Sequence, residues 1–300
     1  MKIFIAGATG AIGQPLIAEL IRQGHTVTGM TTSAPGAAKL ARAGAAVAQV
    51  SALNAAGVDA AIRQAAPEVI IDELTSLPRN PADMAASFER DRQVRLEGGG
   101  NLLRAAVAYG VRRYIQQASG FFLAPGPGLG DESQPLAVGA SPQVAASARS
   151  YTELEERLAA APLEGVALRY GFFYGPNTWY NPDGAVADQV CQQQVPIIGK
   201  GEGVYSWVHI DDAAMATVAA LTAPLGKYHI VDDDPSPLHV WLPAFASFVR
   251  APSPPHVTEE QARAAAGEDA IYYQTKLRGA SNAKAKQVLG FRPRPLEWLV

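Results

Sequence analysis

The feature that most constrains this chain is its opening, where a short apolar run leads into three glycines spaced three residues apart. The run from Lys2 to Ala6 is short and β-branched enough to be a buried strand. Leu16, Ile17, Leu20 and Ile21 then follow at helical spacing. A strand, a glycine turn and a helix therefore lie within about two dozen residues, which is the context that a dinucleotide-binding turn requires.

Each glycine has a steric role in such a turn. Gly7 permits the tight turn out of the strand, Gly10 lets the backbone approach a diphosphate, and Gly13 allows close packing of helix on strand. Phosphates would lie over the free N–H groups of the helix start, where the helix dipole favours negative charge. The alternative is a glycine-rich turn that binds nothing. We predict a dinucleotide site made by Gly7, Thr9, Gly10, Ala11, Ile12 and Gly13.

Length and charge narrow the class of protein. The 300 residues are 48% hydrophobic, which suits one large α/β domain or one domain with a small appendage. The net charge of −3 gives no electrostatic reason to expect nucleic acid or a membrane surface as a partner. No apolar run reaches membrane-spanning length and Met1 precedes a strand directly, so we expect a cytoplasmic protein. The single Cys191 is expected to be a small buried hydrophobe, and no metal site is expected.

Strands and helices alternate along the first half of the chain. Further strands are predicted at 25–30, 46–50, 67–72, 113–119 and 165–169. Helices are predicted at 35–43, from after Asn54 to Ile62, at about 83–109 and at 151–160. The Pro- and Gly-rich segment 124–142 is predicted to be a loop. This alternation predicts an α/β fold with a Rossmann-type doubly wound parallel sheet, whose ligands lie beyond the carboxyl ends of the strands. We expect a dinucleotide-binding domain over 1–170, with elements of about 204–231 returning to it, and a smaller substrate-binding lobe over 171–300.

The end of the second strand bears on cofactor choice. Thr31, Thr32 and Ser33 occupy the positions where an acidic residue would bind the adenosine ribose, or a basic one the 2′-phosphate of NADP. Neither is present, and the absence of a carboxylate favours NADP over NAD, with Lys39 as a possible helper. In the alternative interpretation, these hydroxyls only cap the helix that starts near Pro35.

With these pieces in place, the chain resembles the extended, or atypical, short-chain dehydrogenase/reductases, the group that contains nucleotide-sugar epimerases and dehydratases. The resemblance covers nearly the whole chain. It rests on the glycine turn 7–13, on 98–103, on 168–171 continuing to 174–176, on 207–214 and on 278–282. It implies a Rossmann-type fold, a nicotinamide dinucleotide and a small-molecule substrate, and it is compatible with a homodimer.

Members of this group use a Ser or Thr at the end of the fifth strand and a Tyr and Lys four residues apart on the next helix. A cation beside a phenol lowers its pKa, so that its proton can move as hydride is transferred. Ser119 falls at the hydroxyl position. Tyr151 is the only tyrosine on the expected helix, but four residues later stands Glu155. Either Tyr151 works with Arg149 as a substitute cation, or the usual acid–base pair is absent.

Asp72 and Glu73 end the fourth strand, and either could be a general base. Because neighbouring strand residues point to opposite faces, at most one of them should face the pocket. The resemblance and the positions at the strand ends also suggest further contacts. We assign Leu74, Thr75, Gln117 and Tyr170 to the cofactor, and Phe121, Tyr174, Trp207, Tyr273 and Arg278 to the substrate. A pocket lined by these aromatic residues suits a flat or apolar substrate better than a polar sugar nucleotide.

Three functions remain open on this basis. The first is an NAD(P)-dependent oxidoreductase for a small carbonyl or alcohol, with Ser119 and Tyr151 at the reacting oxygen. The second is a non-redox isomerase, dehydratase or cyclase that uses Asp72 or Glu73. The third is a dinucleotide-sensing regulatory protein without turnover.

Overall fold

The computed structural model describes all residues from 1 to 300 and contains one large parallel sheet. Seven strands lie in the order β3–β2–β1–β4–β5–β6–β11, and every neighbouring pair is parallel. Their bounds are β1 (Lys2–Ala6), β2 (Thr26–Thr31), β3 (Ala46–Gln49), β4 (Val69–Asp72), β5 (Arg113–Ser119), β6 (Glu164–Tyr170) and β11 (Gly226–Ile230). The predicted doubly wound α/β fold is confirmed. The strand order reverses between β1 and β4, which is where such sheets bind ligands.

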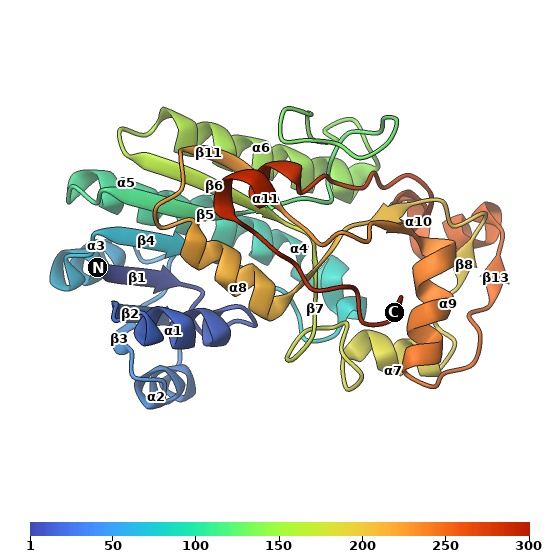
Figure 1. Ribbon diagram of the computed structural model, residues 1–300, viewed down its shortest axis with the longest axis horizontal. Coiled ribbons are helices and arrows are strands. Elements are labelled where there is room, and N and C mark those ends of the chain that lie inside the picture. The colour runs from blue at the N-terminus through green and yellow to red at the C-terminus, as the bar shows by residue number, and fades with distance from the viewer.

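Helices cover both faces of the sheet (Figure 1). One layer contains α1 (Gly13–Arg22), α2 (Ala34–Arg42), α8 (Ile210–Ala219) and α11 (Ala283–Leu289), and the other contains α3 (Ala55–Ala65), α5 (Gly99–Ala108) and α6 (Pro142–Ala160). The alternation along β1 separates the two cores. Ile3 and Ile5 pack in the cluster that includes α1, whereas Phe4 packs in the cluster that includes α5.

The helical stretch after β4 contains an irregular turn. We predicted one helix over about 83–109, and the structure divides this stretch into η1 (Pro81–Asp83), α4 (Met84–Gln93), the π-helical turn η2 (Val94–Gly98) and α5. Glycines let this segment approach the sheet closely. A Cβ on Gly98 would lie 2.8 Å from Cβ of Ala52, and one on Gly99 would lie 3.1 Å from Oδ2 of Asp72.

Helix α6 begins at Pro142, nine residues before the predicted start at Tyr151, so that prediction was wrong at its N-terminal end. The cause is a contact distant in sequence. Oδ1 of Asp269, on α10 (Glu259–Thr275), accepts hydrogen bonds from the backbone N–H groups of Gln143 and Val144 at 3.1 and 3.2 Å. These bonds satisfy donors of the first helical turn that would otherwise have no partner.

The remaining elements build a smaller lobe beside the sheet. They are β7 (Phe172–Tyr174), α7 (Ala185–Cys191), β8 (Ile197–Ile198), β9 (Val204–Tyr205), β10 (Trp207–His209), β12 (Ser236–Pro237), α9 (Leu238–Phe248), β13 (His256–Val257) and α10. Figure 1 shows the chain after α11 running from the sheet to this lobe, where Trp298 joins the aromatic core. Cys191 is exposed at the end of α7, so the expectation that it would be buried was wrong. No helix has the length and apolar character needed to cross a membrane.

Candidate functional site

The glycine turn after β1 has the shape that a diphosphate requires. Gly7 has a φ of +76°, and a Cβ there would lie 2.2 Å from the carbonyl oxygen of Glu73. A Cβ on Gly13 would lie 2.1 Å from the carbonyl oxygen of Ala8, so both glycines are needed for the fold itself. Gly10 differs, because a Cβ there would have only the oxygen of Gly7 within 4 Å, at 3.2 Å. Its outer side is open for a ligand.

The backbone of the same turn offers hydrogen-bond donors. The N–H groups of Ala11 and Ile12 make no hydrogen bond within the chain, and Ile12 is the N-terminal cap of α1. Free amides at a helix start bind anions well. The residues of this turn therefore fit the diphosphate of a dinucleotide.

The hydroxyls at the end of β2 differ in their availability. Oγ of Ser33 accepts a hydrogen bond from the N–H of Gly36 at 3.1 Å and caps α2, and Oγ1 of buried Thr31 accepts one from the N–H of Ser33 at 3.4 Å. Thr32 is exposed and its side chain makes no bond within the chain. Of the three, Thr32 is the one whose hydroxyl makes no hydrogen bond within the chain.

Asp72 and Glu73 are both buried at the end of β4, and each holds a tyrosine. Oδ2 of Asp72 accepts a hydrogen bond from the hydroxyl of Tyr114 at 2.7 Å, and Oε1 of Glu73 accepts one from the hydroxyl of Tyr170 at 2.9 Å. Burial raises the pKa of both carboxyl groups, that of Glu73 to about 8. Oε2 of Glu73 has no hydrogen-bond partner. Glu73 is therefore mainly protonated at neutral pH.

The residues predicted to bind the cofactor beside these carboxyl groups are largely engaged within the protein. The N–H of buried Leu74 donates to Oδ1 of Asp72 at 3.1 Å, and half-buried Thr75 follows it. The hydroxyl of Tyr170 lies 2.6 Å from Oγ1 of Thr217 as well as bonding Glu73. The hydroxyl of Tyr170 therefore has two partners within the protein, Glu73 and Thr217.

Strand β5 carries two of the predicted polar residues at its carboxyl end. Ser119 is almost fully buried, and its Oγ accepts a hydrogen bond from the N–H of Phe121 at 3.4 Å. Oε1 of Gln117 accepts one from Nη1 of Arg95 at 3.2 Å. Arg95, on the π-helical turn η2, is a functional candidate that we did not single out in the sequence.

Tyr151 projects from α6 with only 7% of its surface exposed. The guanidinium carbon of Arg95 lies 5.2 Å from the centre of the phenol ring, within the range of a cation–π contact. The Tyr151 hydroxyl makes no hydrogen bond within the chain. Burial raises the pKa of this phenol, and the charge of Arg95 opposes that rise.

The charged residues near Tyr151 in sequence point elsewhere. Nη1 of Arg149 donates to the carbonyl oxygen of Val138 at 3.1 Å. Glu155 accepts two hydrogen bonds from buried Arg169, at 2.6 and 2.7 Å. This ion pair explains why a carboxylate stands four residues after Tyr151, since it binds an arginine of β6.

Aromatic side chains form a wall next to Tyr151, which we call the aromatic wall: Phe121, Phe122, Phe172 and Tyr273. The rings of Phe121 and Phe172 stack with 4.1 Å between centres, and Phe122 lies 5.9 Å from Tyr151 and 6.2 Å from Tyr273. The wall joins the end of β5, the start of β7, and α10.

Three residues predicted for the substrate have other contacts. Tyr174 and Trp207 are fully buried, and the hydroxyl of Tyr174 donates to the carbonyl oxygen of Pro295 at 3.3 Å. Arg278 donates to the carbonyl oxygens of Pro127 and Gly128 at 2.9 and 3.0 Å. Tyr174 and Trp207 thus lie in the core of the lobe, and Arg278 anchors the loop before α6.

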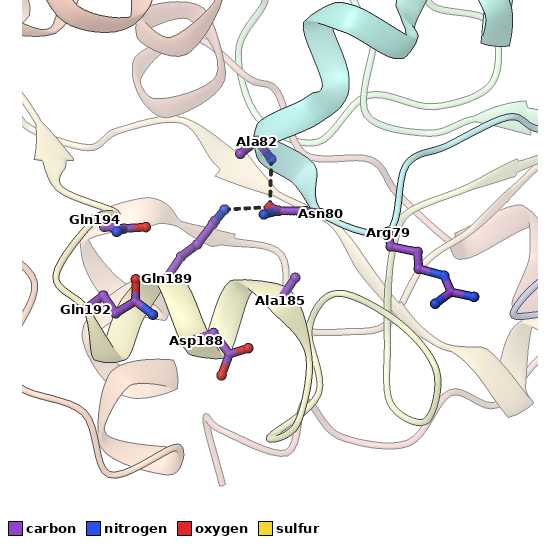
Figure 2. A pocket seen from close by; sticks show the side chains of 8 residues that line it. All are labelled: Arg79, Asn80, Ala82, Ala185, Asp188, Gln189, Gln192 and Gln194. Atoms are coloured by element: carbon purple, nitrogen blue, oxygen red, sulfur yellow. Dashed lines mark hydrogen bonds between the residues drawn. The ribbon is translucent and has the colours of Figure 1, made fainter.

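A polar pocket of about 400 Å³ lies between the segment after β4 and α7 (Figure 2). Oδ1 of Asn80 accepts hydrogen bonds at 3.0 Å from the N–H of Ala82 and from Nε2 of Gln189. Figure 2 shows the side chain of Arg79 turned away from the other labelled residues. None of the residues predicted for catalysis lines this pocket, so it is separate from the strand edge where they gather.

A parallel sheet wound on both sides, with a phosphate-binding glycine turn after its first strand, defines a dinucleotide-binding protein of the Rossmann class. A model of the NAD dependent epimerase/dehydratase family matches residues 3–231, and the chain belongs to this family. The resemblance noted in the sequence is thereby confirmed.

The comparisons also identify named relatives. Over 301 residues, the chain is 38% identical to a 3-diazoavenalumate denitrifying reductase from a Streptomyces species, covering 99% of this chain and 98% of the relative. It is 27% identical over 271 residues to a 2-alkyl-3-oxoalkanoate reductase from Stenotrophomonas maltophilia, covering 84% of this chain and 77% of that protein. Family and relatives together show an NAD-dependent enzyme.

Solved structures show the same fold at lower identity. A UDP-glucose 4-epimerase from Thermus thermophilus in complex with NAD is 21% identical and superimposes with a TM-score of 0.75, covering 99% of this chain and 96% of that one. A dTDP-glucose 4,6-dehydratase from Streptomyces venezuelae with NAD bound is 18% identical, with a TM-score of 0.76 and coverages of 99% and 93%.

Proposed function

We propose that this protein is an NAD(P)H-dependent reductase of a small, flat carboxylate that carries a carbonyl or a diazo group. The observation that carries the proposal is the aromatic wall beside Tyr151, a phenol whose hydroxyl has no partner within the chain. Flat apolar surfaces favour a conjugated substrate over a polar sugar nucleotide. The names of both reductase relatives describe carboxylates, one with a diazo group and one with a keto group.

Reduction of a carbonyl group and reduction of a diazo group each consume one hydride and one proton. A carbonyl takes up one hydride and one proton and becomes an alcohol. A diazo carbon takes up one hydride and one proton, forms two C–H bonds and releases dinitrogen. The nicotinamide supplies the hydride when it is bound. The protein must therefore supply one proton and hold the acceptor flat.

Tyr151 is the proton donor in this proposal. Its hydroxyl gives a proton to the atom that gains electron density and recovers one from solvent, and Ser119 polarises the same atom. Phe121 and Tyr273 hold the flat substrate. The residues of the glycine turn, from Gly7 to Gly13, hold the diphosphate through the open side of Gly10 and the free amides of Ala11 and Ile12.

For the cofactor we propose a preference for NADP. No carboxylate stands at the end of β2 to repel a 2′-phosphate, and Thr32 has a free hydroxyl there, beside the start of α2. NAD is the alternative.

A second candidate function is a non-redox isomerisation or elimination that uses Glu73. Its favouring observation is the partnerless Oε2 of a carboxyl group whose pKa is raised to about 8, which suits a general acid or base near neutral pH. Product formation without net consumption of reduced cofactor would distinguish this function from reduction.

Separate Ser119→Ala and Tyr151→Phe variants test the proposed site. We expect Tyr151→Phe to lower kcat by about 10²-fold and Ser119→Ala by about 10-fold, at unchanged affinity for the cofactor. The measurement is steady-state turnover of a keto carboxylate and a diazo carboxylate with reduced cofactor. Unchanged turnover in both variants would remove these residues from the mechanism.

We also propose a homodimer, as the family resemblance implies. Light scattering should then give about twice the chain mass of 31.6 kDa, and a single-chain mass would contradict it.

A further inference from the structure

We propose that Arg95 is the positioning residue for Tyr151 and supplies the cation that the sequence lacks four residues after it. This inference deepens the proposed function, because it names the partner of the proposed proton donor. The pair would join two different helical segments, η2 and α6, whereas a Tyr and Lys four residues apart lie on one helix.

The π-helical turn and the glycines after it bring Arg95 to this position. The turn has i→i+5 hydrogen bonds in place of i→i+4 ones, so its side chains, Arg95 among them, point in other directions than on a regular α-helix. Gly98 and Gly99 let the same segment approach Ala52 and Asp72 closely. Arg95 is buried, whereas the strongly charged helix α4 just before it has no buried residue.

Two hydrogen bonds hold the guanidinium in place. Nε of Arg95 donates to Oδ2 of Asp91 at 2.6 Å, and Nη1 donates to Oε1 of Gln117 at 3.2 Å. Asp91 is itself fixed, because its Oδ1 accepts a hydrogen bond from the N–H of Ser76 at 2.6 Å. A guanidinium that is held at two points keeps its face over Tyr151 without further ordering.

No cation other than Arg95 makes a cation–π contact with Tyr151. Arg149 donates to the carbonyl oxygen of Val138, and Nε and Nη2 of Arg169 both donate to the carboxylate of Glu155. Lys276, at the end of α10, is exposed. Arg95 is thus the cation in contact with the phenol ring.

The charge of Arg95 acts on the oxygen of Tyr151 when its proton leaves. The O–H bond breaks, the proton goes to the substrate atom that gains electron density, and the phenol oxygen carries the negative charge until solvent returns a proton. A nearby fixed positive charge stabilises this state. A guanidinium stays charged throughout the usable pH range, so it supports the phenol without exchanging a proton itself.

The first test measures the ionisation of Tyr151 directly and needs no turnover. A fluorotyrosine at position 151 reports its ionisation through the ¹⁹F chemical shift in the full-length protein. The other groups that act on this phenol are Asp91, Glu73 and Tyr273, and none of them is substituted in the single variants. Arg95→Gln should raise the midpoint pH by about 1 unit, whereas Arg149→Gln should leave it unchanged. An unchanged midpoint in Arg95→Gln, or an equal rise in Arg149→Gln, would overturn the proposal.

Arg95→Gln leaves the carboxylate of Asp91 without its arginine, and this could prevent folding. A second variant keeps the test decisive in that case. The double variant Arg95→Gln/Asp91→Asn removes both charges together. The midpoint should still rise, by less, because the effect of Arg95 on the phenol exceeds the opposite effect of Asp91. A midpoint that falls would contradict the assignment.

A double-mutant cycle then tests the pair in catalysis. We expect Arg95→Gln to lower kcat by about 10²-fold with little change in KM, and Arg95→Lys to keep part of the wild-type kcat. In a protein that already carries Tyr151→Phe, adding Arg95→Gln should lower kcat no further. Independent, multiplying losses would contradict action through Tyr151. Should the wild-type protein reduce neither substrate, the proposed function fails, while the ¹⁹F titration still decides the role of Arg95.

Discussion

The single buried carboxyl group of Glu73, at the carboxyl edge of the sheet, makes the stability of the fold depend on pH. The backbone of Glu73 lies against the glycine turn, where a Cβ on Gly7 would meet its carbonyl oxygen, and its carboxyl group accepts a hydrogen bond from Tyr170. Burial raises its pKa from 4.5 to about 8. The folded protein therefore binds a proton at this group more tightly than the unfolded chain does.

This shift predicts a stability that falls as pH rises. Between about pH 4.5 and 8 the folded state keeps the Glu73 proton and the unfolded state has lost it, so the proton-linked stability present below pH 4.5 is lost as pH rises to 8. Glu73→Gln should remove this dependence and make the protein more stable than wild type at pH 8.5, by on the order of 4 to 5 kcal/mol, with the difference vanishing below about pH 4.5. Urea unfolding at a series of pH values measures it. A constant difference across this range would show that the Glu73 carboxyl does not titrate as described.

Thr32 is the residue on which the proposed cofactor preference can be reversed. A carboxylate there would accept hydrogen bonds from the adenosine ribose and repel a 2′-phosphate. We expect Thr32→Asp to weaken NADPH binding by at least about 10-fold relative to NADH, as measured by fluorescence titration. Thr26→Asp, exposed at the other end of β2, is the charge-matched control. A wild-type protein that already prefers NADH would contradict the proposal.

At the scale of elements, the position of α6 decides where Tyr151 lies. The Pro- and Gly-rich composition before Tyr151 led us to place the start of this helix too late. Asp269 of α10 caps its first turn, from 126 residues away for Gln143. A cap from a distant element leaves no local pattern in the sequence, so no reading of residues 124–151 alone could find it.

The cap predicts a modest but specific loss. Asp269→Ala should destabilise the protein by about 1 kcal/mol, since two backbone donors lose their partner, and should lower kcat because α6 carries Tyr151. Glu268→Ala is the matched control, since that neighbouring carboxylate pairs only with exposed Arg263. Equal effects of the two substitutions on the melting temperature would mean that the cap contributes nothing.

The strands and the glycine turn were predictable because their signals are local. β1 and β5 match the predicted residues. Within the turn, Gly7 is required by its positive φ and Gly13 by a close contact with Ala8 of the same strand–helix unit. Arg95 could not be found in this way. Its helix carries several charged residues, and only the π-helical turn, which has no reliable sequence signal, decides that Arg95 is the buried one.

At the scale of the whole molecule, the C-terminal segment joins the sheet layer to the lobe. Arg294 binds Asp212 of α8 at 2.9 Å, and the N–H of Leu296 donates to Oδ2 of Asp234 at 3.1 Å. Trp298 then packs between Trp207 and Phe245, with ring centres 5.1 and 4.9 Å away. The segment therefore contributes to the core behind the aromatic wall.

Removing that ring should weaken the whole fold. Trp298→Ala should destabilise the protein by about 3–5 kcal/mol, because it leaves a cavity among buried aromatic rings. Leu299→Ala, at a partly exposed neighbouring position, should change stability by less than about 1 kcal/mol. Chemical denaturation measures both. A small loss in Trp298→Ala would show that the C-terminal segment is not part of the core.

The most direct test of the central claim is a cofactor balance. Reduced nicotinamide cofactor and a flat keto or diazo carboxylate are mixed with the wild-type protein, and cofactor absorbance and product are followed together. We predict one reduced cofactor consumed for each product formed, with dinitrogen released from the diazo substrate. Product formed at constant cofactor absorbance, or cofactor bound with no turnover of either substrate, would contradict a reductase.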